Sequence, residues 1–387
     1  MLKVLTLNNI SVVGLERLSR DRYEVASEIK NPDAILLRSY KMHDMDIPPT
    51  LQCVGRAGAG VNNIPVEKLS ALGIPVFNAP GANANAVKEL VVAAMLLAAR
   101  NICQAWEYTK NLEGDDTTLN TQVEQGKKQY AGFELAGKTL GVIGLGAIGR
   151  QVASAAEALG MNVIGFDPGI TVEGAWALSS TVDKAASVDD LMSKVDFITL
   201  HVPLIDATKN LINSSRLQLM KDGATILNFS RAGIVDDDAV LTALDKGKLN
   251  AYISDFPTNQ TRNHSKVITL PHLGASTVEA EDNCAVMVAD QIKDFLENGN
   301  IANSVNFPDA VMPRTSSQRL AIANQNVPNM VGQITTKLAD AKINILDLLN
   351  KSRGEVAYTL IDIEGNADSE VIEAIKSING VLRVRVL

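Results

Sequence analysis

Short apolar runs alternate with helix-like stretches from the beginning of the chain. The first runs are KVLTL, AILL, LQCVG and IPVFN, each of a length that suits a buried strand. This rhythm is typical of consecutive strand–helix units. A long apolar helix is predicted from about residue 84 to 108, and the polar, glycine-containing residues 111–128 then interrupt the pattern.

The alternation restarts at Gly137 and continues for more than a hundred residues. Six strands are predicted there by the runs KTLGVIGLG, MNVIGFD, VDFITLHVP, ATILNFS, NAYISDF and KVITLPH. Helical intervals separate these runs, so we expect an α/β fold built on a doubly wound parallel sheet.

The C-terminal part has a different order of elements. A helix at about 280–298 precedes the proline- and serine-rich segment PDAVMPRTSSQ, which indicates a linker. The elements predicted beyond it are strand RLAIAN, a helix from Pro328 to Ala341, strands NILDLLNKS and VAYTLIDIE, a helix from Asp368 to Ile378 and strand VLRVRVL. This βαββαβ order matches a ferredoxin-like module. Pro328 suits a first helical turn, where an N–H group would have no partner.

Composition and charge narrow the function classes. Apolar residues make up 46% of the chain and charged residues 21%, which is typical of a globular α/β protein. The net charge of −8 comes from interspersed residues without a basic stripe, so we expect no nucleic-acid partner. The most apolar stretch, residues 90–99, is too short to cross a bilayer, so we expect no membrane partner. The three cysteines form no metal-like cluster, which predicts free thiols, a reducing compartment and no metal site.

The most specific motif lies in the run LGVIGLGAIGRQVASAAEALGMNVIGFDP. Gly144, Gly146 and Gly149 follow an apolar strand and open a helix, and Asp167 ends the next strand about 20 residues further on. The glycines allow a tight turn, a close approach of the backbone to a pyrophosphate, and close helix–strand packing. The helix N-terminus offers free N–H groups to the phosphates. Asp167 would bind the adenosine ribose and repel a 2′-phosphate, which favours NAD over NADP.

Three later strands end in residues suited to chemistry, namely His201, Arg231 and His272. Ligands of such sheets bind outside the carboxyl ends of the strands, so we expect all three at one crevice. An arginine can clamp a carboxylate through two parallel hydrogen bonds. A histidine, with an ordinary pKa of about 6.5, suits the removal of a hydroxyl proton, although a strand-end histidine can also be a packed polar residue.

The motifs GLGAIGR, HVP with TKNLI, NFSRAGIVD and PHLGAST, in this order, resemble the D-2-hydroxyacid dehydrogenases. The whole chain is similar to members of that family that carry a C-terminal ACT domain. The resemblance implies a flavodoxin-like substrate domain formed by residues 1–92 and 281–306, and a Rossmann-type NAD-binding domain at 93–280. It also implies a linker at 307–317 and an ACT regulatory domain at 318–387.

The resemblance implies catalytic roles as well. His272 matches the family's acid/base, and Arg231 matches the arginine that binds the substrate carboxylate and polarises the carbinol oxygen. The family places a glutamate against the imidazole, whereas Asn259 occupies that catalytic position here. Three explanations remain open: Asp255 substitutes, a glutamate arrives from elsewhere, or the base works with a neutral partner.

Binding residues follow from the same resemblance. Those expected to bind NAD are Gly144, Gly146, Ala147, Ile148, Gly149, Asp167, His201, Val202, Pro203, Ser230, Asp255 and Gly274. Those expected to bind a phosphorylated 2-hydroxy acid are Arg38, Ser39, Lys41, Ala59, Gly60 and Asn83. Asn326 and Asn344 match positions that bind an effector amino acid, usually serine, between two paired ACT domains.

The resemblance implies a cytoplasmic homodimer or homotetramer that oxidises 3-phosphoglycerate to 3-phosphohydroxypyruvate with NAD, at the entry to serine synthesis, with serine as a candidate effector. One alternative is a reductase of glyoxylate, hydroxypyruvate or another 2-keto acid. The ACT-like tail argues against it, because an end-product sensor suits a biosynthetic first step. The other alternative is a non-catalytic, NAD-responsive regulator on the same fold. Arg231 and His272 argue against this regulator, while Asn259 leaves it some room.

Overall fold

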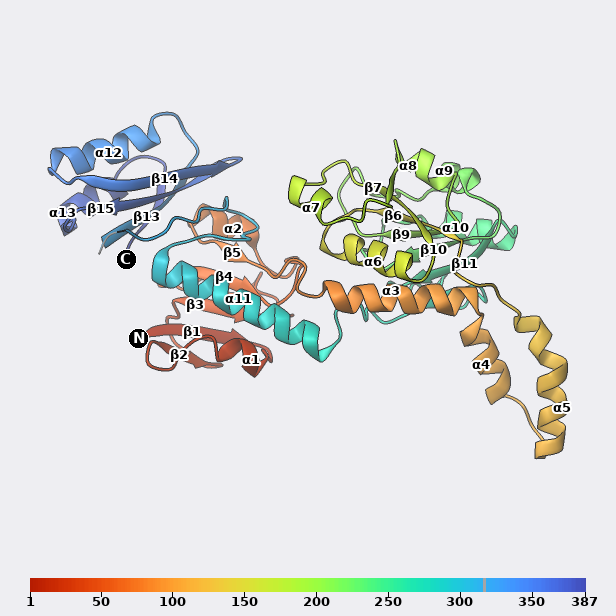
Figure 1. Ribbon diagram of the computed structural model, residues 1–387. Coiled ribbons are helices and arrows are strands. Elements are labelled where there is room, and N and C mark those ends of the chain that lie inside the picture. Colours follow the sequence, from red (N-terminus) through yellow and green to blue (C-terminus); the bar gives the residue numbers. More distant parts are fainter. Residues whose placement is uncertain (316–317) are drawn as a thin grey trace. The chain divides into compact units, whose positions relative to one another are not determined.

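The structure, a computed structural model, describes residues 1–315 and 318–387 and forms two compact units (Figure 1). The first unit comprises residues 1–83 and 278–387, and the second comprises residues 84–277. The C-terminal βαββαβ segment is therefore part of the first unit. Within the described ranges, no helix combines the length and the apolar character needed to cross a membrane.

A five-stranded parallel sheet of order β2-β1-β3-β4-β5 forms the core of the first unit. Its strands are β1 (Leu2–Leu7), β2 (Tyr23–Ala26), β3 (Ala34–Leu37), β4 (Cys53–Arg56) and β5 (Val76–Phe77). The helices are α1 (Val12–Leu15), α2 (Val66–Ala71) and α11 (Val278–Asn298). Figure 1 shows α11 along β3 and β4, where it buries Val288, Ile292 and Phe295. This strand order is the flavodoxin-like one.

The second unit contains a seven-stranded parallel sheet of order β12-β11-β10-β9-β6-β7-β8. The strands are β6 (Thr139–Ile143), β7 (Asn162–Phe166), β8 (Asp183–Lys184), β9 (Phe197–Leu200), β10 (Ala224–Asn228), β11 (Leu249–Ser254) and β12 (Val267–Thr269). All six predicted strands are present, and the short β8 was not predicted. Because every pair is parallel, the carboxyl ends of these strands lie at one edge of the sheet.

The helices of the second unit differ in two places from the predicted pattern. They are α3 (Ala84–Ala99), α4 (Ile102–Lys110), α5 (Asp116–Gly126), α6 (Ala147–Ala158), α7 (Val172–Trp176), α8 (Val188–Met192), α9 (Ser214–Leu219) and α10 (Asp237–Asp245), with the 3₁₀ turn η1 (Lys127–Tyr130). The prediction of one helix over residues 84–108 is wrong, because Asn101 has a left-handed φ of 50° and separates α3 from α4. The polar residues 111–128 include α5, whose N-cap Asp115 accepts a hydrogen bond from the backbone of Thr118.

The C-terminal module is an antiparallel sheet of order β14-β15-β13-β16 with two helices. Its elements are β13 (Gln318–Gln325), α12 (Met330–Asp340), β14 (Ile345–Arg353), β15 (Val356–Ile363), α13 (Ser369–Lys376) and β16 (Val381–Val386), which confirms the predicted βαββαβ order. The prediction that Pro328 starts the first helix is wrong. Asn329 has a left-handed φ of 63°, and α12 begins only at Met330. The expected linker, 307–317, includes residues 316 and 317, which lie outside the described residues.

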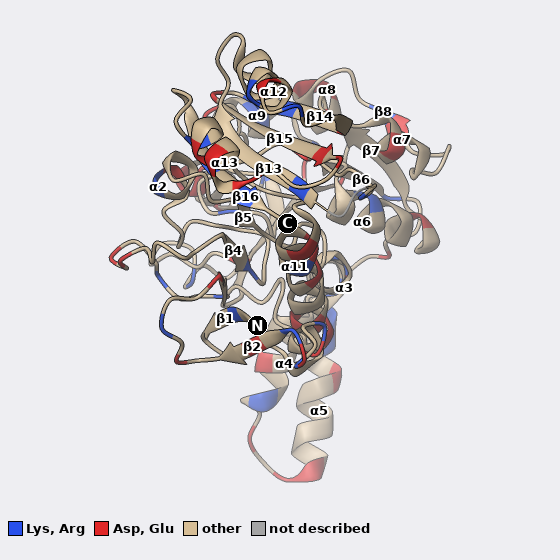
Figure 2. Cartoon of the chain, turned by 90° about the vertical axis from the view of Figure 1, so that its left-hand side faces the viewer, with Lys and Arg blue, Asp and Glu red and all other residues tan. Residues whose placement is uncertain are grey.

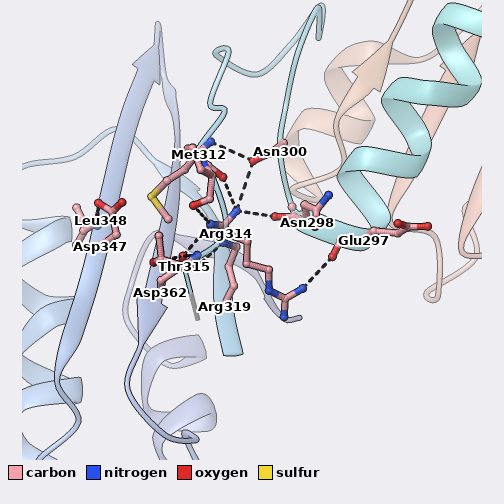
Figure 3. A network of polar contacts seen from close by, with 12 residues as sticks. Glu297, Asn298, Asn300, Met312, Arg314, Thr315, Arg319, Asp347, Leu348 and Asp362 are labelled. Carbon is pink, nitrogen blue, oxygen red and sulfur yellow. Dashed lines mark hydrogen bonds and ion pairs between the residues drawn. The ribbon is translucent and has the colours of Figure 1, made fainter. Parts of the chain in front are cut away.

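A buried ion pair lies within the module, and its arginine also bonds to residues that precede the module (Figure 3). Arg319 and Asp362 are both 0% exposed, and two nitrogens of Arg319 lie 2.6 and 2.9 Å from the two carboxylate oxygens of Asp362. The same guanidinium donates to the carbonyl oxygens of Asn298, Met312 and Pro313 at 3.0, 2.8 and 2.9 Å. These hydrogen bonds offset the free-energy cost of removing the guanidinium of Arg319 from water.

The carbonyl groups at the end of α11 accept hydrogen bonds from the module. Arg385 of β16 donates to the carbonyls of Phe295 and Leu296 at 3.0 and 3.1 Å, and its guanidinium lies 4.2 Å from the centroid of the Phe295 ring. The hydroxyl of Tyr358 donates to the carbonyl of Gly299 at 2.8 Å. These contacts attach the module to the C-terminal end of α11 and to the residue that follows it.

Exposed charges are spread over the chain without a single dominant sign. Figure 2 shows Lys and Arg mixed with Asp and Glu on the side that it draws. Several form exposed pairs, such as Lys376 with Glu373 at 2.8 Å and Arg17 with Asp290 at 2.8 Å. Exposed pairs of this kind contribute at most about 1 kcal/mol each, so the buried pair at the module matters more.

Candidate active site

The turn between β6 and α6 contains the three glycines of the sequence motif. Gly144 has a φ of 89°, and a Cβ atom there would lie 2.4 Å from the carbonyl oxygen of His201. A Cβ atom at Gly149 would lie 1.9 Å from the carbonyl oxygen of Gly144, whereas one at Gly146 would meet open space. Gly146 begins α6 without a capping side chain, so the N–H groups of the first turn remain available. The turn can therefore hold a pyrophosphate on backbone N–H groups.

Asp167 follows β7 and holds the glycine turn in place. Its Oδ2 accepts a hydrogen bond from the backbone of Leu145 at 2.8 Å, and its Oδ1 accepts one from the backbone of Gly169 at 2.9 Å. A carboxylate oxygen can accept more than one hydrogen bond, so the carboxylate can still accept ribose hydroxyls.

His201 follows β9 and is half-buried. Its Nε2 lies 2.9 Å from the hydroxyl of Thr199, and its Nδ1 is buried with no hydrogen-bond partner among the residues that the structure describes. Burial lowers the pKa of His201 to about 3. The carbonyl of the next residue, Val202, accepts a short hydrogen bond from the hydroxyl of Ser230, and Pro203 beyond it is exposed. His201, Val202 and Pro203 can line a cofactor site, but they supply no charge there.

Arg231 follows β10 and is exposed. Its Nη1 donates to the carbonyl of Ser230 at 2.7 Å, and within the described part of the chain its guanidinium forms no ion pair. Asn228, which the sequence analysis missed, donates from Nδ2 to the carbonyl of Arg231 at 3.0 Å and accepts at Oδ1 from the backbone of Ser230 at 3.2 Å. The available signal for Asn228 was an amide side chain at the end of an apolar strand.

His272 lies in the loop after β12 and is exposed, with a left-handed φ of 57°. Its ring meets the ring of Phe256 edge-on, with the centroids 5.1 Å apart and an interplanar angle of 66°. Asp255 follows the neighbouring strand β11 and binds the same loop. Its two carboxylate oxygens accept hydrogen bonds from the backbones of Leu273 and Gly274, at 2.9 and 2.8 Å.

Asn259 lies in an exposed turn after β11. The hydroxyls of Thr258 and Thr261 lie 2.9 Å apart and close this turn. In the described residues no hydrogen bond joins Asn259 to His272. The acid nearest in sequence, Asp255, bonds through both of its oxygens to loop N–H groups, and no hydrogen bond joins it to the imidazole among the described residues.

The candidate substrate residues lie in the first unit, at the ends of two neighbouring strands. Arg38 follows β3, and its Nη1 lies 2.6 Å from a carboxylate oxygen of Glu281, in the first turns of α11. Arg56, which the sequence analysis missed, ends β4 and donates to the carbonyl of Arg38 at 2.9 Å. Ser39 and Lys41 are exposed beyond Arg38.

The backbone beyond β4 makes a tight turn. Gly58 has a φ of 155°, and a Cβ atom there would lie 2.6 Å from the guanidinium of Arg56. Ala59 and Gly60 follow this turn, and Asn83 directly precedes α3. The structure thus gathers two arginines and a glycine turn at the ends of β3 and β4, where an anionic group can be bound.

Asn326 and Asn344 lie at opposite ends of the module sheet. Asn326 donates to the carbonyl of Gly354 at 3.0 Å, next to the turn between β14 and β15. Asn344 precedes β14 and donates to the carboxylate of Glu364 at 3.2 Å. Because nine residues of β14 separate the two ends, the asparagines are roughly 25–30 Å apart. A single module cannot place both on one amino acid.

One groove among the described residues adjoins the predicted site. A groove of about 520 Å³ beside α6 is lined by Lys88, Ala147 and Arg150 among others. A larger groove, of about 720 Å³, follows β16 and contains none of the residues predicted to bind a ligand. The strand ends and the glycine turn therefore define the candidate site better than groove size does.

Comparisons with known proteins agree with this geometry. Residues 92–274 match the family described as D-isomer specific 2-hydroxyacid dehydrogenase, NAD binding domain. A D-3-phosphoglycerate dehydrogenase from Haemophilus influenzae is 34% identical over 385 residues, which cover 95% of this chain and 89% of that protein. One from Methanocaldococcus jannaschii is 37% identical over 349 residues, covering 88% of this chain and 63% of that longer protein.

Solved structures show the same fold. The NAD⁺-bound 3-phosphoglycerate dehydrogenase of Entamoeba histolytica matches with a TM-score of 0.61 and 26% identity, over 79% of this chain and 98% of that one. The D-mandelate dehydrogenase of Rhodotorula graminis matches with a TM-score of 0.67 and 22% identity, over 81% and 99% of the two chains. At that identity, the second match supports the fold alone.

Proposed function

Because the chain belongs to the D-2-hydroxyacid dehydrogenases, we propose that it oxidises 3-phosphoglycerate to 3-phosphohydroxypyruvate with NAD. Membership makes the chain an NAD-dependent oxidoreductase with a small-molecule substrate. One observation carries the proposal: Arg231 and His272 follow β10 and β12, at the same sheet edge as the glycine turn that follows β6. Four relatives named D-3-phosphoglycerate dehydrogenase support the choice of substrate.

Different residues bind the substrate and accept its proton. NAD, when bound, supplies the acceptor for a hydride. Arg231 binds the substrate carboxylate through parallel, charge-assisted hydrogen bonds, and His272 takes the proton of the 2-hydroxyl. His201 stays neutral, because burial keeps its pKa at about 3, so it is not the base.

The phosphate group is assigned to the first unit. Arg38 and Lys41 follow β3, and Arg56 ends the adjacent β4. Arg38 is paired with Glu281 in the structure, so a phosphate would replace that carboxylate as its partner. Guanidinium groups suit phosphate because their planar donors match two oxygens at once.

The C-terminal module is proposed to be an ACT domain that binds serine in a homodimer or homotetramer. The separation of Asn326 and Asn344 supports this assembly, because two antiparallel modules would bring Asn326 of one copy towards Asn344 of the other. A cytoplasmic location is proposed on the basis of the free thiols of Cys53, Cys103 and Cys284.

The deciding experiment measures NADH absorbance with a panel of 2-hydroxy and 2-keto acids, with and without a phosphate group. We expect kcat/KM for 3-phosphoglycerate to exceed that for glycerate and lactate by about 10-fold or more, since each charge-assisted contact contributes about 1.5–3 kcal/mol. Faster reduction of glyoxylate or hydroxypyruvate would support the reductase instead. NAD binding without any turnover would support the regulator.

Calorimetry with serine on the intact oligomer tests the module. Binding that is lost in Asn326→Ala and in Asn344→Ala is the expected result. Asn350→Ala is a matched control, because Asn350 lies on β14 and bonds to Thr359 within the sheet at 2.7 Å. An absence of serine binding to the unmodified protein would remove the effector assignment.

A further inference from the structure

A chain of hydrogen bonds joins the loop of Arg231 to the loop of His272. It begins at Asn228, the last residue of β10, which is 1% exposed. The side-chain amide of Asn228 bridges the turn that follows, since Oδ1 accepts from the backbone of Ser230 at 3.2 Å and Nδ2 donates to the carbonyl of Arg231 at 3.0 Å. The direction in which Arg231 leaves the sheet is therefore set by a buried neighbour.

The chain continues through the backbone into the neighbouring strand. The N–H group of Asp255 donates to the carbonyl of Asn228 at 3.1 Å. Asp255 is 1% exposed, and its carboxylate accepts from the backbones of Leu273 and Gly274 at 2.9 and 2.8 Å. These two residues directly follow His272, so every link between the two exposed catalytic side chains is a short contact.

The loop of His272 needs such an anchor. A non-glycine residue at a φ of 57° lies in a sparsely populated region, and such a conformation persists only where neighbours determine it. The two hydrogen bonds from Leu273 and Gly274 to Asp255 provide that constraint, and the edge-on contact with Phe256 sets one side of the imidazole.

We propose that Asn228 and Asp255 are positioning residues that fix Arg231 and His272 relative to one another, and that His272 has no acidic partner within its own unit. The inference rests on the proposed function for the roles of Arg231 and His272. Asp255 acts through the loop backbone, because both of its oxygens face N–H groups there. Phe256 replaces the usual carboxylate as the neighbour of the imidazole, and it orients the ring without adding charge.

The test compares Asn228→Ala, Asn228→Asp and Asp255→Asn with the unmodified protein. Asn228→Asp retains an acceptor for the N–H of Ser230 but puts an oxygen against the carbonyl of Arg231. Since a displacement of about 1 Å can cost about 100-fold in rate, we expect kcat to fall about 10- to 100-fold in each variant. The NAD dissociation constant should change little in the Asn228 variants. The urea midpoint should fall, because Asn228 is buried and its backbone partners lose a hydrogen bond, but the fall should be too small to unfold the protein under assay conditions. Asn250→Ala is the matched control, because Asn250 lies at the amino end of β11 and bonds to Thr225 at 3.3 Å.

Coupling between the two positions separates positioning from general destabilisation. If Asn228 and Asp255 act as one unit, the double variant should lose less than the product of the two single losses. Loss of kcat in strict proportion to the loss of stability, or fully multiplicative losses, would overturn the proposal.

Hydrogen exchange gives a measurement that does not depend on activity. The amide protons of Leu273 and Gly274 should be protected in the unmodified protein and exchange at least about 10-fold faster in Asp255→Asn. If that variant does not fold, unprotected amides at 273 and 274 in the unmodified protein would still refute the anchor. A protein that shows this protection and coupling but prefers another substrate would refute only the proposed function.

Discussion

The carboxyl edge of the seven-stranded sheet and the junction between the C-terminal module and α11 use charged groups in opposite ways. At the sheet edge, Arg231 and His272 are exposed, and buried polar neighbours fix the backbone around them. At the junction, Arg319 and Asp362 are themselves buried and use their donors and acceptors on each other and on nearby backbone. At the sheet edge the charged side chains remain available to a ligand. At the module junction they are already bonded to other groups of the protein.

The pKa of the buried carboxylate at the junction shows why it is unsuited to a reaction. Burial by itself would raise the pKa of Asp362, but hydrogen bonds from Arg319 and Thr315 outweigh burial and lower that pKa below its ordinary value. This carboxylate therefore stays charged at neutral pH and is unsuited to proton transfer. A group that reacts must stay accessible, so its position has to be set through the residues beside it.

The largest effect is expected at His272. His272→Asn removes the proposed base but tolerates the left-handed backbone, so turnover should fall about 10²- to 10⁴-fold while NAD affinity is retained. Turnover is read from NADH absorbance and NAD affinity from fluorescence. His264→Asn is the control, because His264 is a histidine of the same unit that pairs with Asp245 at 3.2 Å. Turnover within threefold of the unmodified protein would contradict the assignment.

The next effect is expected at the buried pair. Asp362→Ala leaves the guanidinium of Arg319 buried without its carboxylate, so the free energy of unfolding should fall by about 3–5 kcal/mol. Urea denaturation, followed by circular dichroism, measures this loss. Glu373→Ala, which breaks the exposed pair with Lys376, should cost less than about 1 kcal/mol. Equal losses in the two variants would mean that burial of the pair does not matter.

A smaller effect is expected when Arg231 becomes lysine. Arg231→Lys keeps the positive charge but loses the planar fork that binds two carboxylate oxygens, so kcat/KM should fall by about 10- to 100-fold. Arg216→Lys is matched to it, because Arg216 lies in the same unit and pairs with Asp189 at 2.7 Å. An unchanged kcat/KM in Arg231→Lys would show that a point charge is sufficient.

The smallest effect concerns the pH dependence of stability. The pKa of His201 is about 3 in the folded state, below the ordinary value of 6.5, so the unfolded state binds a proton first as the pH falls. The contribution of His201 is complete above about pH 6.5 and is lost between about pH 6.5 and 3. At pH 5.5 the loss should be about 1.4 kcal/mol relative to pH 8, and His201→Asn should lack it. Urea titrations at the two pH values measure the difference, and identical pH dependence in both proteins would contradict the lowered pKa of His201.

Much of the fold could be predicted because its strands are short, apolar and buried. The strand β8 could not be, since Asp183 and Lys184 provide no apolar signal. The break at Asn101 was missed for another reason. A single left-handed residue redirects the chain without disturbing the hydrophobic pattern on either side, as Asn329 also does before α12.

The site could be predicted only in part. Arg231 and His272 closely follow strands and lie in recognisable motifs, so their place at the sheet edge follows from the order of the elements. The proposed role of Asn228 depends on hydrogen bonds to backbone groups two and three residues away. The proposed role of Asp255 depends on N–H groups 18 and 19 residues further along. Such partners are brought together by folding, and residue type alone does not reveal them.

A crystal structure of the protein with NAD and 3-phosphoglycerate tests the central claim most directly. The account predicts that the substrate carboxylate lies on the guanidinium of Arg231 while a ring nitrogen of His272 lies within about 3.2 Å of the 2-hydroxyl oxygen. A complex in which the two side chains contact different molecules, or in which the hydroxyl group is out of reach of the imidazole, would contradict it.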